Sequence, residues 1–431
     1  MTAEIAIFNK TAIALAADSA ATITNNGVHK KIYNGSEKLF TLSKHHPVGV
    51  MIYGNSEVCG APWELLIKSF RAENKDTSYP TLTEWCQAFF DYASSNDKII
   101  TKQMRENYIM AFHFNDIMPG IFKDINKLAE EESVKIARVV TIDEYHAITN
   151  NYLDDFIALL NDCPYFEDFD ENDAIESLET ISNYLQTLCG DFIISDDRGI
   201  PDQIKQKILI ILSLTSTKKS PLGITSGIVF AGFGNDEYYP SILAFDVFGF
   251  LGNKVRKIFN IAKSSINSDA NVIPYAQDQE VQLFLKGCYD DLLTHGQQTY
   301  SKCHDETLSQ VQTVLQESLP AEIATELFEK IKLNTEGYIP SAEESVNSFI
   351  NMNYNQKVMS MLSFLPKQEL AYMAESLVNL TAFKRKVSDD HETVGGPIDV
   401  ALISKTDGFI WVKRKHYFSP ELNHHFFSKN G

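Results

Sequence analysis

The chain has 431 residues, and its hydrophobic content of 44%, with 11% aromatic residues, is enough to build a substantial core. Its formal net charge of -19 argues against a general affinity for nucleic acid or for an anionic membrane, because both would repel it. Six cysteines without metal-type spacing, a start without a signal-peptide pattern and apolar runs too short to span a bilayer predict a soluble cytoplasmic protein with reduced thiols.

Short apolar runs near the start of the chain predict four β-strands in two consecutive pairs. The runs are Ile5–Phe8, Thr11–Ala17, Lys38–Leu42 and Val48–Tyr53. The first pair ends at Asp18 and the second ends before Gly54. We expect all four strands to form one small antiparallel sheet.

Helical periodicity follows over a long stretch. Trp63, Leu66, Ile67 and Phe70 fall on one face of a predicted helix, and the helical pattern then continues from Tyr79 to about residue 214. Acidic loops separate the successive apolar stripes of this stretch. We therefore expect a helical insertion over residues 75–220.

Strands and helices alternate again in the second half of the chain. Ser226–Gly232 and Pro240–Asp246 predict a hairpin, helices are expected from about Pro274 onward, including one over Gln282–Leu293, and two further strands are expected near the end, at Ile398–Ile403 and Phe409–Val412. Without an internal repeat or a Pro/Gly linker, this order predicts a single α+β domain over residues 1–431, with an expanded helical layer at residues 274–384.

Thr2 has the chemistry of a nucleophile that carries its own base. Removal of Met1 leaves the hydroxyl and a free α-amine, whose ordinary pKa is about 8, on adjacent carbons. A buried lysine beside that amine would lower its pKa by like-charge repulsion, and an aspartate would hold the lysine in place; Lys38 and Asp18 fit these roles. Gly54, after a strand, is the candidate for an N–H that binds an oxyanion.

The arrangement of these residues resembles the start of proteasome β-subunits and bacterial proteasome-like peptidases. The residues that carry the resemblance are Thr2, Ala6, Ala16-Ala17-Asp18-Ser19, Thr22, Lys38-Leu39-Phe40, Gly49 and Gly54. The spacing from Thr2 to Asp18 is that of the family, and Lys38 opens the expected strand after a loop a few residues longer. The resemblance resumes at Ser226–Gly232, at Ile242–Gly249 and at Gly395-Gly396.

The resemblance implies a fold and an activity. The fold is the four-layer αββα sandwich of the N-terminal nucleophile hydrolases, with two antiparallel sheets and here a large helical insertion. The activity is that of a threonine-type peptidase or amide hydrolase that works through an acyl-enzyme, without cofactor or metal. Implied partners are a peptide or protein substrate, further copies of the chain in a homo-oligomer and a separate ATP-dependent unfoldase.

Other parts of the family pattern are less complete. In the family, an aspartate and a serine precede the glycine pair and support the terminal amine, and Asp390 and Thr393 fill those positions if one residue is inserted. The family's further serine falls among Ser264, Ser265 and Ser268, and no spacing selects one of them. Ala20 stands where the family often has an arginine. No propeptide precedes Thr2, so activation would rely on methionine aminopeptidase.

Each candidate residue also has a structural interpretation, and a second function stays open. Asp18 alone suits a strand end, Lys38 a solvated strand start and Gly54 a turn. The paired histidines at His45-His46 and His424-His425 diverge on a strand and do not predict a metal site. The alternative function is a catalytically inactive proteasome-like scaffold or assembly subunit that binds protein partners through its helical insertion. A third possibility is a small amide substrate in place of peptides.

Overall fold

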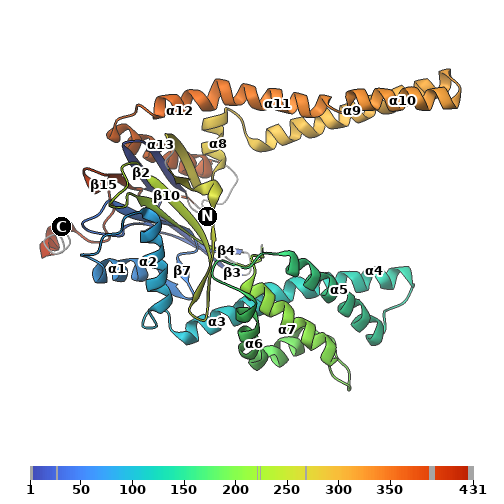
Figure 1. Ribbon diagram of the computed structural model, residues 1–431, viewed down its shortest axis with the longest axis horizontal. Helices are drawn as coiled ribbons and strands as arrows, with labels where there is room; N and C mark the ends of the chain where they lie inside the picture. Colours follow the sequence, from blue (N-terminus) through green and yellow to red (C-terminus); the bar gives the residue numbers. More distant parts are fainter. Residues whose placement is uncertain are drawn as a thin grey trace. The chain divides into compact units, whose positions relative to one another are not determined.

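The computed structural model describes residues 3–25, 28–220, 222–223, 225–266, 269–387 and 394–425. It is a mixed structure of long helices and antiparallel sheets (Figure 1). The chain divides into two compact units. Unit 1 comprises Met1–Ser36, Ser268–Leu402 and Trp411–Gly431, and unit 2 comprises Glu37–Asn267 and Ile403–Ile410.

A five-stranded sheet, most of whose residues belong to unit 1, joins strands from both ends of the chain in the order β13-β1-β2-β14-β15. Its strands are β1 (Glu4–Asn9), β2 (Ala12–Ala17), β13 (Ala270–Ala276), β14 (Asp399–Ser404) and β15 (Gly408–Lys413). A separate hairpin is formed by β3 (Ala20–Asn25) and β4 (Val28–Asn34). β1 pairs antiparallel with both β2 and β13, and every residue of β1 and β2 is buried. Such strands are covered on both faces.

The helices of unit 1 follow β13 in the sequence. They are α8 (Gln279–Lys286), α9 (Asp290–Ser318), α10 (Ala321–Thr335), α11 (Tyr338–Ile350), α12 (Gln356–Leu362) and α13 (Lys367–Val387). α13 lies against β1 and β2 (Figure 1), where Leu370 and Leu377 pack in one core with Ile5 and Ile7. α9 lies alongside α10 and α11 in a long helical hairpin.

The main sheet of unit 2 has the order β11-β10-β9-β6-β5. Its strands are β5 (Leu39–Thr41), β6 (Val48–Gly54), β9 (Ser226–Gly232), β10 (Ser241–Leu251) and β11 (Lys254–Phe259). The short β12 (Ser265–Ile266) pairs with β10, and β7 (Glu57–Val58) pairs with β8 (Ala61–Pro62). The apolar side chains of β6 and β9 are buried because helices of the same unit pack on the sheet.

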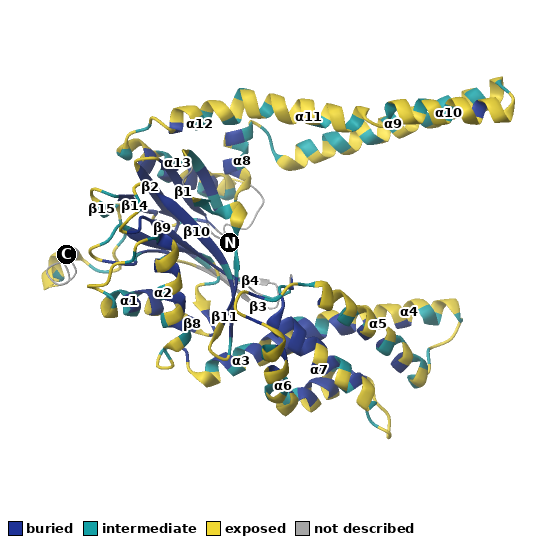
Figure 2. Cartoon of the chain, viewed as in Figure 1, coloured by how far each residue is buried: buried dark blue, intermediate teal, exposed yellow. Residues whose placement is uncertain are grey.

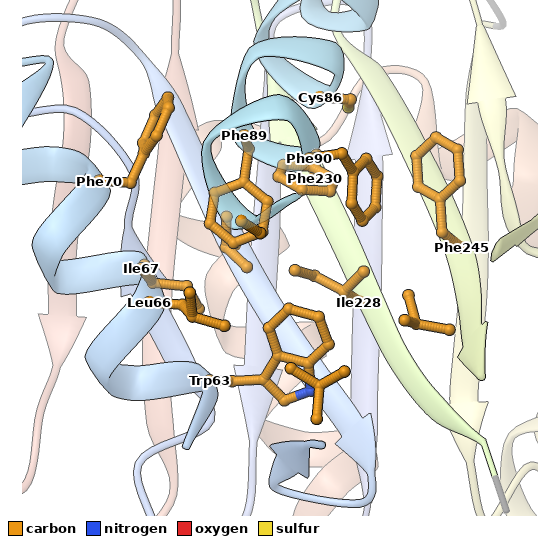
Figure 3. Packing of buried hydrophobic residues seen from close by; sticks show 14 of the residues in the cluster. Trp63, Leu66, Ile67, Phe70, Cys86, Phe89, Phe90, Ile228, Phe230 and Phe245 are labelled. Atoms are coloured by element: carbon orange, nitrogen blue, oxygen red, sulfur yellow. The ribbon is translucent and has the colours of Figure 1, made fainter. Parts of the chain in front are cut away.

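The helices of unit 2 build two cores. They are α1 (Trp63–Glu73), α2 (Leu82–Ser95), α3 (Lys102–Phe112), α4 (Met118–Lys135), α5 (Ile142–Asp162), α6 (Glu171–Phe192) and α7 (Asp202–Thr217). α1 and α2 pack aromatic rings on the sheet: Phe89 meets Phe230 with ring centroids 5.4 Å apart (Figure 3). A second core joins α3 to α7 through residues such as Leu153 and Ile208.

Many predicted elements are confirmed. The hairpin β1–β2, the pair β5–β6, the central hairpin β9–β10 and the final pair β14–β15 lie where the apolar runs place them. Helices α2 to α7 fall inside the predicted insertion at residues 75–220. The α+β class is therefore as expected.

Three expectations are wrong. The first two strand pairs belong to different sheets, and the hairpin β3–β4, which the apolar runs do not predict, lies between them in the sequence. The helices begin at Gln279, because Pro274 lies in β13, an edge strand where proline is tolerated. The helix expected over Gln282–Leu293 is broken at Gly287, whose φ of 74° caps α8.

No helix within the described ranges is long and apolar enough to cross a membrane.

Candidate active site

Asp18 ties the start of the chain to the end of β2. Its side chain is fully buried, its Oδ1 accepts a hydrogen bond from the Ala3 amide at 3.1 Å, and its own amide donates to the Ala3 carbonyl at 3.1 Å. Two hydrogen bonds therefore close the open end of the β1–β2 hairpin. Since Ala3 directly follows Thr2, this contact fixes the chain one residue after the predicted nucleophile.

The glycine pair near the end of the chain lies beside the same carboxylate. Asp18 Oδ2 accepts hydrogen bonds from the amides of Gly395 at 2.9 Å and Ala20 at 3.4 Å. The Ser19 amide donates to the Gly395 carbonyl at 3.2 Å. Gly396 has a φ of 78°, and a Cβ there would lie 2.9 Å from Asn34 Cβ, so this loop needs glycine. The structure thus brings together two segments that the sequence pattern singled out separately.

Lys38 is a buried residue, with an exposed fraction of 5%. It immediately precedes β5, and its carbonyl accepts a hydrogen bond from the Ile52 amide at 2.9 Å. A buried ammonium needs hydrogen-bond or charge partners, so the interpretation of Lys38 as a solvated strand end is wrong. The backbone just before it is also held, because the Gly35 and Ser36 amides donate to the Ser19 carbonyl at 3.0 and 3.1 Å.

Gly54 ends β6 in a conformation that favours glycine. Its φ is 76°, and a Cβ there would lie 3.3 Å from the Thr225 carbonyl oxygen. The following turn is fixed by Ser226, whose Oγ donates to the Asn55 carbonyl at 2.6 Å and accepts from Trp63 Nε1. The backbone at Gly54 is therefore held by β9 and the start of α1, as a preorganised N–H donor requires.

Some predicted site residues cannot be placed. Thr2, Asp390, Thr393 and Ser268 lie outside the described residues. Of the other candidate serines, Ser264 has a structural role: its Oγ donates to the Asn260 carbonyl at 2.7 Å and accepts from the Ala244 amide at 2.9 Å. Ser265 opens the short strand β12.

A polar cluster next to Gly54 was not predicted. Tyr53 donates its hydroxyl hydrogen bond to Asp246 Oδ1 at 2.8 Å, and Asn260 Nδ2 donates to Asp246 Oδ2 at 2.9 Å. The Tyr53 ring lies over Gly227, where a Cβ would be 2.1 Å from Tyr53 Cζ. The available signal was Asp246 itself, a single charge in the apolar run of β10.

A second arrangement of catalytic residue types is inaccessible. His113 Nε2 lies 2.9 Å from Ser216 Oγ, and His113 Nδ1 lies 2.8 Å from the Tyr184 hydroxyl. Both His113 and Ser216 are completely buried. Burial, followed by repulsion from Arg256, lowers the pKa of His113 to about 3. A substrate cannot reach this serine, so we interpret the cluster as part of the helical core.

His45 and His46 are the adjacent pair whose side chains are expected to diverge. Within the described part of the chain, neither belongs to a group that could bind a metal ion. Burial, and next the charges of His45 and Lys405, lower the pKa of His46, whose ring packs on Trp85 with centroids 5.5 Å apart. Among the residues that the structure describes, no group of three or more His, Cys, Asp or Glu side chains is arranged to hold a metal ion.

A scan against models of protein families finds no match to the chain, and a search of curated proteins finds no significant match either.

Proposed function

We propose that this protein is an N-terminal nucleophile hydrolase, a threonine-type peptidase or amide hydrolase whose nucleophile is Thr2 after removal of Met1. The observation that carries the proposal is the buried Asp18 carboxylate, which accepts hydrogen bonds from the amides of Ala3 and Gly395. It ties the residue next to Thr2 to the glycine pair, which in the family that the chain resembles follows an aspartate and a serine that support the terminal amine.

The sheet organisation of the two units supports the αββα sandwich as the proposed fold. Each unit contributes one antiparallel sheet with helices packed on one face, α13 in unit 1 and α1 with α2 in unit 2. β1, β2 and β9 are buried along their whole length, so each needs a covering layer on both sides.

The proposed reaction uses groups of the chain alone. The Thr2 amine accepts the proton of Thr2 Oγ while Oγ attacks the substrate carbonyl, and the Gly54 N–H stabilises the oxyanion that forms. The ammonium then returns the proton to the leaving amine as the C–N bond breaks, which leaves an acyl ester on Thr2. Water, activated by the same amine, hydrolyses the ester and restores the free hydroxyl.

Two charged residues prepare the amine in this proposal. The ammonium of Lys38 keeps the Thr2 amine neutral by repulsion, which makes it a base near neutral pH. Asp18 is assigned two tasks: the anchoring of Lys38, which the family resemblance implies, and the positioning of Ala3, which its hydrogen bond supports. The proposal also includes the expected surroundings of the site. It assumes peptide or protein substrates, a homo-oligomer, a separate unfoldase and a cytoplasmic location. It further assigns to Asp390 and Thr393 the support of the Thr2 amine.

The intact mass of the purified protein is the first test. The proposal expects loss of Met1 and, after treatment with a peptide epoxyketone, one covalent adduct that maps to Thr2. Thr2→Ala should abolish the adduct, Thr2→Ser should keep it, and Thr77→Ala, at an exposed threonine, should label as the unchanged protein does. A protein that retains Met1 and shows no Thr2-dependent labelling would contradict the proposal.

A second candidate is the inactive scaffold, and here the long helical hairpin of unit 1, rather than the insertion at residues 75–220, offers the surface for partners. No residue of α9 or α11 is buried, and only Ala324 of α10 is (Figure 2). Large apolar side chains such as Leu333 and Phe349 are 70% and 57% exposed. Exposed apolar surface of this kind is typical of protein-binding elements. Under this candidate, Met1 is retained and removal of the hairpin abolishes partner binding.

A further inference from the structure

The long helical hairpin of unit 1, formed by α9 with α10 and α11, exposes a continuous apolar face. Six large apolar residues, two from each helix, define this face, and each is between 38% and 60% exposed (Figure 2). They are Tyr300 and Val314 in α9, Ile323 and Leu327 in α10, and Val346 and Phe349 in α11. Their spacing within each helix returns to the same side of a helix with about 3.6 residues per turn.

The apolar face lies on one side of the seam between the helices. At the seam, Ala324 of α10 is buried and Val311 of α9 is half-buried. Val314 follows Val311 by three positions, which turns it from the seam by about 60°. Leu327 has the same relation to Ala324. Because α9 and α10 are antiparallel in the hairpin, equal turns in the same sense lead to the same face.

The opposite face of the hairpin is polar. Ser301 and Asp305 of α9 and Glu343 of α11 line one pocket there. Val346 and Phe349 follow Glu343 by three and six positions, so they are turned from it by about 60° and 120°, in the sense that leads to the apolar face. α11 therefore divides polar from apolar residues in the same way as α9 and α10.

The apolar face is uncharged, although the hairpin as a whole is strongly acidic. Residues 290–350, all of which are described, contain eleven acidic residues and three lysines. The helical positions between Tyr300 and Val314 on this side are Cys303, Thr307 and Gln310, so no described residue of this face is an Asp, Glu, Lys or Arg. Two such faces can meet without repulsion of like charges, whereas the acidic sides of the hairpin would repel each other and an anionic membrane.

The hairpin lacks a core of its own. Among the described residues of α9, α10 and α11, Ala324 alone is buried. Helices in proteins gain most of their stability from the packing of an apolar side. A second hairpin on the apolar face would bury this face and would also cover half-buried seam residues such as Val311 and Phe328. Two helical hairpins packed in this way form a four-helix bundle.

The area of the apolar face is sufficient for a stable dimer. A fully exposed large apolar residue presents on the order of 200 Å². With their exposed fractions, the six residues present roughly 600 Å² per copy, or about 1,200 Å² for two copies. This is the lower end of the area that stable interfaces bury, before any polar atom is counted. A twofold interface also needs a patch that is complementary to itself, and an uncharged apolar face meets this condition.

We infer that the apolar face joins two copies of this chain, hairpin against hairpin, in a four-helix bundle with twofold symmetry. The occupant of the face is the same face of a second copy. The inference does not rest on the proposed hydrolase activity, because none of these residues belongs to the Thr2 site.

Sedimentation equilibrium of the full-length protein tests the inference. The expected mass is twice that of one chain, or an even multiple of it. Phe349→Glu should halve this mass at the same concentration, and Leu327→Glu should do the same, because each places a charge inside the interface. Leu333→Glu is the matched control. Leu333 is 70% exposed but lies on another side of α10, so the mass should stay unchanged.

Three outcomes would overturn the inference. The first is a monomeric unmodified protein at tens of micromolar, which would leave the face to a different partner. The second is a mass that Phe349→Glu and Leu327→Glu both leave unchanged. The third is a Leu333→Glu protein whose mass is also halved. Each variant is checked for an unchanged circular dichroism spectrum.

The exposed thiol of Cys303 reports whether this face is the one that is covered. In the dimer the thiol is shielded, so Phe349→Glu should raise its rate of reaction with a maleimide by about fivefold or more, as measured by peptide mass spectrometry. A thiol introduced by Ser309→Cys, at an exposed position on another side of α9, should react at the same rate with and without Phe349→Glu. Equal rates at Cys303 in the two proteins would contradict the assignment of the interface.

Discussion

The carboxylate of Asp18 accepts a hydrogen bond from the amide of Gly395 at 2.9 Å, although the two residues are 377 positions apart in the sequence. The other oxygen of Asp18 accepts the Ala3 amide. One buried side chain therefore joins the start of the chain to the loop before its final strands. This contact leads to a prediction about stability that is independent of catalysis.

Asp18→Asn should destabilise the protein by about 2–4 kcal/mol. The asparagine has one accepting oxygen, so its amide group would face either the Ala3 or the Gly395 N–H and leave a buried donor unpaired. Urea unfolding followed by circular dichroism measures the effect. Asp236→Asn, in an exposed turn, is the control and should change stability by less than about 0.5 kcal/mol. An equally small effect of Asp18→Asn would contradict the buried contact.

The Gly54→Ala variant should distinguish a loss of stability, caused by the backbone conformation, from a loss of reactivity at Thr2. Gly54 and Gly199 both have a φ of 76°, but nothing lies within 4 Å of a Cβ at Gly199. Alanine at either position should cost about 1 kcal/mol of stability because of the positive φ, with somewhat more at Gly54. Only Gly54→Ala should also slow epoxyketone labelling of Thr2, by at least tenfold, since it shifts the proposed oxyanion donor. Equal labelling rates in the two variants would remove Gly54 from the site.

Gly227→Ala should be strongly destabilising because of one neighbour. A Cβ at this position would lie 2.1 Å from Tyr53 Cζ, so the ring must move and its hydrogen bond to Asp246 must break. We expect a loss of about 2–4 kcal/mol. In the Tyr53→Ala background the same change should cost much less, and a double-mutant cycle measures the difference. Additive effects would show that the close approach is not the cause.

The burial of His113 should make the free energy of unfolding decrease as the pH is lowered. Its pKa is about 3 in the folded protein and about 6.5 when unfolded, so the unfolded state binds the additional proton between these values. The contribution of His113 to the free energy of unfolding is complete above pH 6.5. It is lost as the pH falls toward 3, by about 1.4 kcal/mol for each pH unit. Urea unfolding from pH 7 to pH 4 should show a shallower decline in His113→Gln than in the exposed control His295→Gln. Parallel declines would contradict the burial of a neutral His113.

The sequence by itself determined the local elements and the residue types of the site. Apolar runs of strand length give β1, β2, β6 and β9, and a 3.6-residue period gives α1, because side-chain pattern and backbone propensity act over a few residues. The same local logic singled out Asp18, Lys38 and Gly54 as residues at the ends of apolar strands.

Only the tertiary structure decided which strands share a sheet and which side chains meet. The backbone of one apolar strand can form hydrogen bonds with almost any other strand. No local pattern therefore specifies that β1 pairs with β13 or that β6 of the pair β5–β6 joins β9. The burial of Lys38 and the approach of Gly395 to Asp18 depend on these long-range pairings. These pairings bring together segments that are separated by up to hundreds of residues in the chain. The periodicity of a short segment carries no information about them.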